Sequence, residues 1–316
     1  MDSLAGCHSG AVPIIRMQET RYRGRFAPSP TGPLHFGSLV AAVGSCLDAR
    51  RNGGRWLLRI EDVDTPRNVP GAADEILATL DGLGFEWDGD VVWQSQRFDA
   101  YQALLDRLRL DGHLYPCACS RREISGSAGA LSVDGGRVYP GTCRAGLPPG
   151  RKARAWRLRV PDAVIGCDDR VQGRVEQNLE RAVGDCVLRR ADGLFAYQLA
   201  VVADDAEAGV TDVVRGADLV DSTPRQIWLQ QCLGVATPHY AHLPVATNPA
   251  GEKWSKQTLA PAISPAEGVA LLARAMRFLG QPVPEEAAGL SLHDFWTWAR
   301  AHWSMAAVPR CRALVG

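Results

Sequence analysis

Apolar runs and helical faces alternate along the chain from residue 22 onward, with breaks rich in Pro and Gly between them. Short apolar runs predict strands at Arg23–Phe26, Trp56–Ile60 and Val91–Trp93. Amphipathic segments predict helices over His35–Arg50, Ala72–Leu83 and Phe98–Leu110. Alternating strands and helices are typical of a parallel sheet, whose ligands bind beyond the carboxyl ends of the strands. The break at residues 27–33 therefore lies where a site is expected.

The pattern is interrupted and then returns. Residues 115–160 hold cysteines, a basic run and a Gly/Ser-rich stretch at 125–136 that predicts a mobile loop, so they are interpreted as an insertion. Further strands are expected at Leu194–Ala203 and Val210–Val214, and a helix at Pro224–Leu233. Two more helices are expected near the end of the chain. Ser264-Pro-Ala-Glu267 is a capping-box sequence with proline at the first helical position, and Ser291 opens the other helix.

Composition excludes several classes of protein. The 35 Lys and Arg residues balance 35 Asp and Glu residues, so a site for a polyanion must be a local patch. No apolar stretch approaches the roughly 18–20 residues of a membrane span, and the first residues lack the features of a signal peptide. Nine cysteines in 316 residues, an odd number, favour a reducing cytoplasm over a disulfide scaffold. Residues 1–20 are expected to be a disordered tail, with Met1 and Met17 both open as the start.

The segment from Arg25 to Ser38 carries the most informative chemistry. It is expected to form a strand, a rigid turn and a helix N-terminus that bears His35, Gly37 and Ser38. A helix N-terminus attracts phosphate, and Gly37 permits a nucleotide to approach the backbone. His35 can donate to phosphate oxygens whose charge grows in a transition state. The alternative is a proline-rich turn with an ordinary surface histidine.

A second candidate for phosphate binding is Glu252-Lys-Trp-Ser-Lys-Gln257. Only three of the 35 basic residues are lysines, and two of them, Lys253 and Lys256, stand in this loop. Two ammonium groups can clamp a triphosphate and offset the charge of a leaving pyrophosphate. The alternative, two solvated surface lysines, is disfavoured by the scarcity of lysine elsewhere in the chain.

Three further residues fit either a substrate pocket or an ordinary structural role. Glu61 and Arg215 follow expected strands, where they can bind the opposite charges of an amino acid or form plain ion pairs, Glu61 with Arg59 or Arg67. Tyr197 is either a pocket residue or a core aromatic.

Cys117-Ala-Cys119 and Tyr139-Pro-Gly-Thr-Cys143 form a third group of candidates. Three thiolates and a phenolate oxygen can satisfy tetrahedral zinc, although spacing alone equally allows three buried free cysteines. The run from 144 to 160 contains six basic residues and no acidic ones, which fits either an RNA phosphate patch or a solvated edge strand. The remaining cysteines have no partner at ligand spacing and are interpreted as core or incidental: Cys7, Cys46, Cys167, Cys186, Cys232 and Cys311.

The Arg25–Ser38 and Glu252–Gln257 strings resemble the HIGH and KMSKS elements of class I aminoacyl-tRNA synthetases, in the branch for glutamate and glutamine. Trp254 departs from the Met or Leu usual in the second element. The resemblance covers about residues 23–260 and implies an α/β, Rossmann-like catalytic domain. It implies that ATP with Mg²⁺ binds through His35 and Lys256, and that Gly37, Ser38 and Lys253 also serve catalysis. It implies a glutamate site with Glu61 on the ammonium group and Arg215 on the side-chain carboxylate, built from Arg25, Phe26, Ala27, Pro28, Ser29, Glu61, Tyr197 and Arg215.

The cysteine and tyrosine pattern is similar to the zinc site of short paralogues in this branch, the glutamyl-queuosine tRNA(Asp) synthetases. Its spacer between Cys119 and Tyr139 is longer than expected. Only 59 residues follow Gln257, which indicates a short helical C-terminal part and no anticodon-binding domain. In addition, Val201 stands at the position where the full-length glutamyl enzymes have asparagine. The resemblance therefore implies Zn²⁺ on Cys117, Cys119, Tyr139 and Cys143.

The same resemblance implies a two-step reaction. L-Glutamate is activated by ATP without tRNA, and the glutamyl group is then transferred to queuosine at the wobble position of the tRNA(Asp) anticodon arm. Three alternatives stay open: a truncated glutamyl-tRNA synthetase that charges the tRNA 3′ end, an inactive regulatory paralogue, and a ligase for another small acid on the same fold.

This resemblance also suggests how the chain is divided. The expected parts are a tail (1–20), the first half of the catalytic domain (21–114), a zinc-binding, acceptor-like insertion (115–160), the second half of the catalytic domain (161–245), and the KMSKS-like loop with a helical C-terminal segment (246–316). The protein is expected to be cytoplasmic, with no membrane partner.

Overall fold

The computed structural model describes residues 21–126, 130–133, 135–254 and 261–316 of the chain. The strands are β1 (Arg23–Phe26), β2 (Arg55–Ile60), β3 (Val92–Trp93), β4 (Leu114–Cys117), β5 (Ala155–Leu158), β6 (Val164–Asp169), β7 (Gly173–Asn178), β8 (Cys186–Arg189), β9 (Asp212–Gly216), β10 (His239–Leu243), β11 (Val245–Thr247) and β12 (Ala313–Val315). The α-helices are α1 (Phe36–Arg51), α2 (Ala72–Gly82), α3 (Phe98–Leu110), α4 (Arg121–Ser125), α5 (Leu179–Ala182), α6 (Tyr197–Glu207), α7 (Thr223–Leu233), α8 (Gly268–Phe278) and α9 (Leu292–His302). The predicted tail, residues 1–20, lies outside the described residues.

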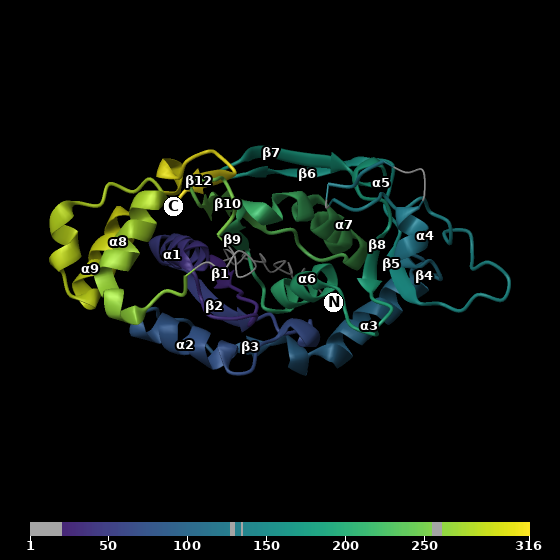
Figure 1. Cartoon of the computed structure of the whole chain (residues 1–316), viewed down its shortest axis with the longest axis horizontal. Helices are drawn as coiled ribbons and strands as arrows, with labels where there is room; N and C mark the ends of the chain where they lie inside the picture. Colours follow the sequence, from purple (N-terminus) through teal and green to yellow (C-terminus); the bar gives the residue numbers. More distant parts are fainter. Residues whose placement is uncertain (1–20, 127–129, 134, 255–260) are drawn as a thin grey trace, which may run out of the picture.

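Parallel strands form the middle of an elongated molecule, with α8 and α9 at one end and the small sheet of β4, β5 and β8 at the other (Figure 1). β1, β2 and β3 pair in parallel, and so do β9 and β10. The two parallel sheets meet where the N–H of Thr211 donates to the carbonyl of Arg23 at 3.0 Å. β1 and β9 are therefore neighbours. The next strand of the sheet after β1 is β2 and the one after β9 is β10, and these lie on opposite sides of the β1–β9 pair. The region beyond the carboxyl ends of β1 and β9 is therefore a topological switch point, where ligands bind in such sheets.

Side chains alternate across these strands and so supply two different surfaces. Leu58 and Ile60 of β2 join the main apolar core, which also contains the buried face of α1. Arg59, between them, points to the opposite side, where it pairs with Asp205 of α6. One face of the sheet is thus sealed by apolar packing, and the other carries buried charges.

Helix α6 corrects the strand expected at Leu194–Ala203. Residues from Tyr197 onward are helical, and only Leu194–Ala196 remain extended before the helix begins. Residues 199–205 of α6 are all buried, so the segment lacks the polar face that identifies a helix by its period. A short, continuously apolar run reads equally well as a buried strand.

The start of α8 also differs from its prediction. Pro265–Glu267 form a 3₁₀ turn, in which the hydroxyl of Ser264 accepts from the N–H of Ala266, and α8 itself begins at Gly268, whose φ is +50°. The signal at Ser291 is confirmed, because its hydroxyl accepts from the N–H of Asp294 at the first turn of α9.

The inserted region forms an antiparallel sheet in the order β4-β5-β8. β5 is its middle strand, so the solvated edge strand considered for residues 154–159 is wrong. The sheet takes its third strand from Cys186–Arg189, beyond the expected insertion 115–160; the proposed domain boundaries stay predictions.

The antiparallel hairpin β6–β7 follows the insertion and packs on α7 and β10. Near the C-terminus, β12 pairs in parallel with β11. Within the described ranges, no helix combines the length and apolar character needed to cross a bilayer.

Leu47 of α1 is fully buried in the main core. Leu47→Ala is expected to lower the free energy of unfolding by about 2–5 kcal/mol, because it leaves a cavity beneath the sheet. Denaturant titration would measure the change. Leu110→Ala, at a leucine of α3 that is 82% exposed, is the matched control and should change stability by no more than about 0.5 kcal/mol. Equal losses in the two variants would contradict the packing described here.

Candidate active site

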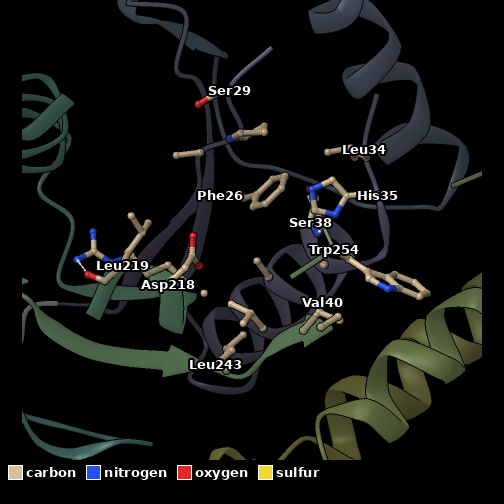
Figure 2. A pocket seen from close by; sticks show the side chains of 18 of the residues that line it. Phe26, Ser29, Leu34, His35, Ser38, Val40, Asp218, Leu219, Leu243 and Trp254 are labelled. Carbon is tan, nitrogen blue, oxygen red and sulfur yellow. Dashed lines mark hydrogen bonds between the residues drawn. The ribbon is translucent and has the colours of Figure 1, made fainter. Parts of the chain in front are cut away.

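A cavity of about 460 Å³ opens at the carboxyl ends of β1, β2 and β9, a size typical of small-molecule sites. Figure 2 shows His35, Ser38 and Trp254 on one side of it and Asp218 and Leu219 on the other, with Phe26 between them. All the residues predicted for the ATP and glutamate sites that the structure describes line this cavity: Arg25, Phe26, Ala27, Pro28, Ser29, His35, Gly37, Ser38, Glu61, Tyr197, Arg215 and Lys253. Lys256, the remaining predicted residue, lies outside the described residues.

His35 forms the N-cap of α1. Its Nδ1 accepts from the N–H of Ser38 at 3.3 Å, and its Nε2 lies 3.1 Å from the hydroxyl of Ser38. The first turn of α1 holds no acidic side chain, so the positive end of the helix is not neutralised by the chain itself. The helix N-terminus at the cavity wall is therefore suited to phosphate.

The turn before α1 lies against residues 262–263, and the start of α1 approaches Trp254 of the lysine-containing string. His35 forms a β-bridge with Ala262, and the N–H of Ile263 donates to the carbonyl of Leu34 at 3.0 Å. A Cβ on Gly37 would stand 3.2 Å from the ring of His35 and 3.5 Å from the carbonyl of Trp254. A glycine at residue 37 thus allows close approach of the two predicted nucleotide elements.

Trp254, the departure from the usual loop sequence, is held by aromatic packing. Its ring meets Phe36 edge-on at 5.8 Å, and the guanidinium of Arg274 lies 4.4 Å over Phe36 and 5.6 Å over Trp254. The larger side chain is accommodated by these contacts between the loop, α1 and α8.

Sequence reasoning assigned no role to Asp218, which lines the cavity and pairs with Lys253 at 2.6 Å. The signal was present in the chain, because Asp218 ends the Val-Val-Arg-Gly-Ala-Asp string that begins at Val213. This ion pair places one ammonium group of the loop at the cavity wall.

Buried ion pairs support the side of the cavity where the sequence predicts a glutamate site. The carboxylate of Asp205, a second residue that sequence reasoning missed, accepts from Arg59 at 2.7 Å and from Arg25 at 3.2 Å. Burial alone would raise the pKa of Asp205, but Arg25 and Arg59 outweigh it and hold that pKa below its ordinary value. Asp205 is therefore ionised between the two arginines.

Glu61 has both of the roles that its sequence position allowed, an ion pair with an arginine and a place in the wall of the cavity. It pairs with Arg59 at 3.1 Å and also lines the cavity. Burial raises the pKa of Glu61 above its ordinary value, although Arg59 and Arg25 oppose the shift. A cationic ligand group beside Glu61 would favour its ionised form.

Arg215 is buried at the end of β9 and presents one nitrogen without a partner. Its Nε donates to Nε2 of His242 at 3.0 Å and its Nη2 donates to Thr223 at 2.9 Å, whereas the buried Nη1 has no hydrogen-bond partner among the described residues. A buried donor of this kind is costly unless a ligand satisfies it. Tyr197 lines the same cavity, and burial, then the charge of Glu61, raises its pKa to about 12, so its hydroxyl keeps its proton.

The structure brings the four predicted zinc ligands together. The sulfur atoms of Cys117, Cys119 and Cys143 all lie within 4.8 Å of one another, and the Tyr139 hydroxyl lies 3.3 Å from Cys117 and 3.7 Å from Cys119. Burial opposes ionisation of Cys117, yet its hydrogen bonds with Tyr139 and Arg157 lower its pKa. Three soft sulfur atoms with a fourth donor in reach match the ligand chemistry of zinc.

The cysteines outside this group follow their predicted roles where they are described. Cys46, Cys186 and Cys232 are buried, and Cys167 and Cys311 are half-buried. Cys7 lies outside the described residues.

Much of the basic run at 144–160 is engaged inside the protein. Arg157 is buried and donates to Cys117 and to the carbonyl of Asp185, and Arg144 pairs with Asp185 and Glu180. Arg151 pairs with Glu123. RNA contact by this run stays a prediction, with Arg151, Lys152 and Arg154 as its exposed basic members.

Comparisons with a protein family and with curated proteins agree on the family of this chain. Residues 21–267 match the family described as tRNA synthetases class I (E and Q), catalytic domain. A glutamyl-Q tRNA(Asp) synthetase of Dechloromonas aromatica is 68% identical over 92% of this chain and 96% of its own length. The enzyme of the same name from Chromobacterium violaceum is 57% identical over 93% of this chain and 97% of its own.

Solved structures of similar fold are longer. A glutamate-tRNA synthetase from Elizabethkingia anophelis superposes with a TM-score of 0.76 at 26% identity, over 93% of this chain and 68% of that one. A glutamate tRNA ligase from Elizabethkingia meningosepticum, in complex with its amino acid, gives a TM-score of 0.77 at 26% identity, over 93% of this chain and 66% of that one.

Asp205→Asn is expected to destabilise the protein by about 3–5 kcal/mol at pH 7, because it removes the carboxylate that pairs with buried Arg25 and leaves buried Arg59 with fewer counter-charges. The pKa of Asp205 is lower in the folded protein than the unfolded value of about 3.9, so its contribution is complete above pH ~4 and is lost as the pH falls further. Denaturant titrations from pH 7 down to pH 3 should show the difference from wild type shrinking. Asp90→Asn, at an exposed aspartate, is the control; a difference that grows toward acid pH would refute this assignment.

Proposed function

The chain belongs to the glutamyl-Q tRNA(Asp) synthetases, within the class I tRNA synthetases for glutamate and glutamine, and from this membership we propose that it activates L-glutamate with ATP and transfers it to queuosine in tRNA(Asp). It is an ATP-dependent ligase. The observation that carries the proposal is that Glu61 and Arg215 line one cavity and that the buried Nη1 of Arg215 has no partner among the described residues.

Glutamate fits the charges of that cavity. Its α-ammonium group would lie at Glu61, whose ionised form the ammonium group stabilises, and its side-chain carboxylate would accept from Arg215. Glutamine would present an amide N–H₂ group to a guanidinium that only donates, so the pair also discriminates against glutamine. Arg25, Phe26, Ala27, Pro28, Ser29 and Tyr197 would complete the wall.

ATP, with its Mg²⁺, would bind with its phosphates at the N-terminus of α1. The α-carboxylate oxygen of glutamate attacks the α-phosphorus, the bond to the β-phosphate oxygen breaks, and pyrophosphate leaves with that electron pair. His35 and Ser38 would contact the reacting phosphate, Gly37 would allow its approach, and Lys253 with Lys256 would offset the charge that develops on pyrophosphate. No RNA is needed for this step.

The second step transfers the glutamyl group to RNA. A hydroxyl oxygen of the queuosine cyclopentene-diol attacks the carbonyl carbon of glutamyl-adenylate, the bond to the phosphate oxygen breaks, AMP leaves and the hydroxyl proton passes to solvent. An ester on the modified base is the product. The relatives that match over nearly their full length carry the glutamyl-Q name, which favours this acceptor over the terminal ribose.

Zinc is proposed as a structural ion on Cys117, Cys119, Tyr139 and Cys143. The three thiols and the Tyr139 hydroxyl already converge, and Arg157 lies 3.8 Å over the Tyr139 ring. The ion would cross-link β4 to the loop that carries Tyr139 and Cys143 and would take no part in the transfer.

The decisive experiment compares two acceptors. Purified protein is incubated with ATP, labelled glutamate and either queuosine-containing or queuosine-free tRNA(Asp), and ATP–pyrophosphate exchange is measured in parallel without tRNA. Glutamate-dependent exchange together with labelling of only the queuosine-containing tRNA is expected. Equal labelling of both tRNAs would identify a truncated glutamyl-tRNA synthetase, and no exchange with any amino acid would identify a regulatory paralogue.

Arg215→Gln is expected to lower kcat/KM for glutamate in pyrophosphate exchange by at least ~100-fold and to relax discrimination against glutamine, because the buried guanidinium is replaced by an amide. Arg107→Gln, at an exposed arginine on α3, is the matched control and should leave both values unchanged. An unchanged preference for glutamate in Arg215→Gln would remove Arg215 from the glutamate site.

Cys143→Ser is expected to abolish binding of about one zinc ion per chain and to lower the Tm, since metal binding contributes to folding of the small sheet. Metal content by mass spectrometry and the Tm, with and without a chelator, would test this. Cys311→Ser changes a half-buried cysteine outside the group and should keep the metal. Full zinc content in Cys143→Ser would contradict the assigned ligand set.

A further inference from the structure

Two residues outside the cavity lining hold Arg215 in place. His242 of β10 stands opposite Arg215 of β9 in the parallel register, and its Nε2 lies 3.0 Å from Nε of Arg215. Nδ1 of His242 lies 2.6 Å from a carboxylate oxygen of Asp169 at the end of β6. The side chains of His242 and Asp169 are completely shielded from solvent. Arg215, His242 and Asp169 thus form a buried chain that leads away from the cavity.

The donors in this chain determine where the histidine proton lies. Nε of an arginine only donates, so Nε2 of His242 must accept and therefore carries no proton. The ring proton is then on Nδ1 and is donated to Asp169. Burial lowers the pKa of His242 despite the opposing effect of Asp169, which agrees with a neutral ring.

Asp169 is itself firmly held. Its Oδ1 accepts from the N–H groups of Val171, Gln172 and His242 at 2.9, 2.8 and 3.1 Å. Burial would raise the pKa of Asp169, but these bonds and His242 lower it to about 2, so the carboxylate is charged. The charged carboxylate of Asp169, two hydrogen bonds away through His242, supplies a counter-charge to Arg215 and leaves Nη1 of Arg215 without a partner among the described residues.

Thr223 completes the support from another element. Its hydroxyl accepts from Nη2 of Arg215 at 2.9 Å and lies 3.2 Å from Nε2 of His242. Nε and Nη2 of Arg215 are both engaged on the protein side, and Nη1 alone is left for a ligand. The guanidinium plane is therefore fixed before substrate arrives.

We propose that Asp169 and His242 are positioning residues for substrate selection: Asp169 fixes the His242 tautomer that accepts from Arg215, and this orients Nη1 of Arg215 toward the side-chain carboxylate of glutamate. The inference rests on the proposed glutamate site. It adds that selectivity depends on the β6–β7 hairpin, in which Asp169 is the last residue of β6 and which does not line the cavity.

Asp169→Asn tests the inference most directly. An asparagine amide can donate to Nδ1, which moves the ring proton to Nε2 and sets two donors, Nε2 and Nε of Arg215, against each other. The KM for glutamate in pyrophosphate exchange is expected to rise at least ~10-fold, while the KM for ATP stays within about twofold. Arg174→Gln, at an exposed arginine of the same hairpin, should change neither value.

Variants of His242 separate positioning from simple packing. His242→Gln keeps an acceptor near the position of Nε2 and should recover the glutamate KM to within about threefold of wild type, whereas His242→Leu should match Asp169→Asn. In an Arg215→Gln background, Asp169→Asn should cause no further rise in KM, because its effect passes through Arg215. Additive losses, or an unchanged glutamate KM in Asp169→Asn, would overturn the inference.

The tautomer of His242 can also be measured directly, independently of catalysis. Nitrogen NMR of histidine-labelled protein should show the neutral Nδ1–H tautomer at His242 in wild type and its loss in Asp169→Asn, with the Tm reporting that each variant is folded. The same tautomer in both proteins would also overturn the inference. If wild type shows no glutamate-dependent exchange, the proposed function fails, and the tautomer measurement still decides whether Asp169 controls His242.

Discussion

The buried carboxylate of Asp205 is the interaction on which the pocket depends. From α6 it binds Arg25 of β1 and Arg59 of β2, so a single side chain ties two neighbouring strands to the helix beside them. Arg59 in turn holds Glu61 at the cavity wall. Charges this deeply buried are tolerated only in pairs, because a lone charge would carry an uncompensated desolvation cost. The pairing allows charged groups to stand in fixed positions where little water screens them.

The side of the pocket proposed to bind phosphate rests on backbone contacts instead. The bridge between His35 and Ala262 and the approach of Gly37 to the Trp254 carbonyl join two segments that are far apart in the sequence. Trp254, Phe36 and Arg274 pack around this junction. Groups proposed to act on one triphosphate must be preorganised relative to one another, and these contacts between α1, Trp254 and α8 supply that order.

Several features could be predicted from the chain because they depend on neighbours in the sequence. β1, α1 and α3 follow their apolar patterns closely, and the cap at Ser291 follows from its own side chain. α6 could not be predicted in this way, because packing on all sides removes its polar face and with it the helical period. For Glu61 the sequence allowed either an ion pair or a place in a ligand site. In the structure Glu61 both pairs with Arg59 and lines the cavity.

The sequence by itself determined the chemical groups of the site: the turn ending at His35, the paired lysines, the cysteine group and the charges Glu61 and Arg215, all carried by short local strings. Only the tertiary structure decided how those groups are supported. Asp205, Asp218, His242 and Asp169 join the site through strand order and register, since partners up to 180 residues apart meet there, as Arg25 and Asp205 do. The local sequence pattern cannot predict such contacts, because they form only when the parallel strands bring their carboxyl ends to one edge of the sheet.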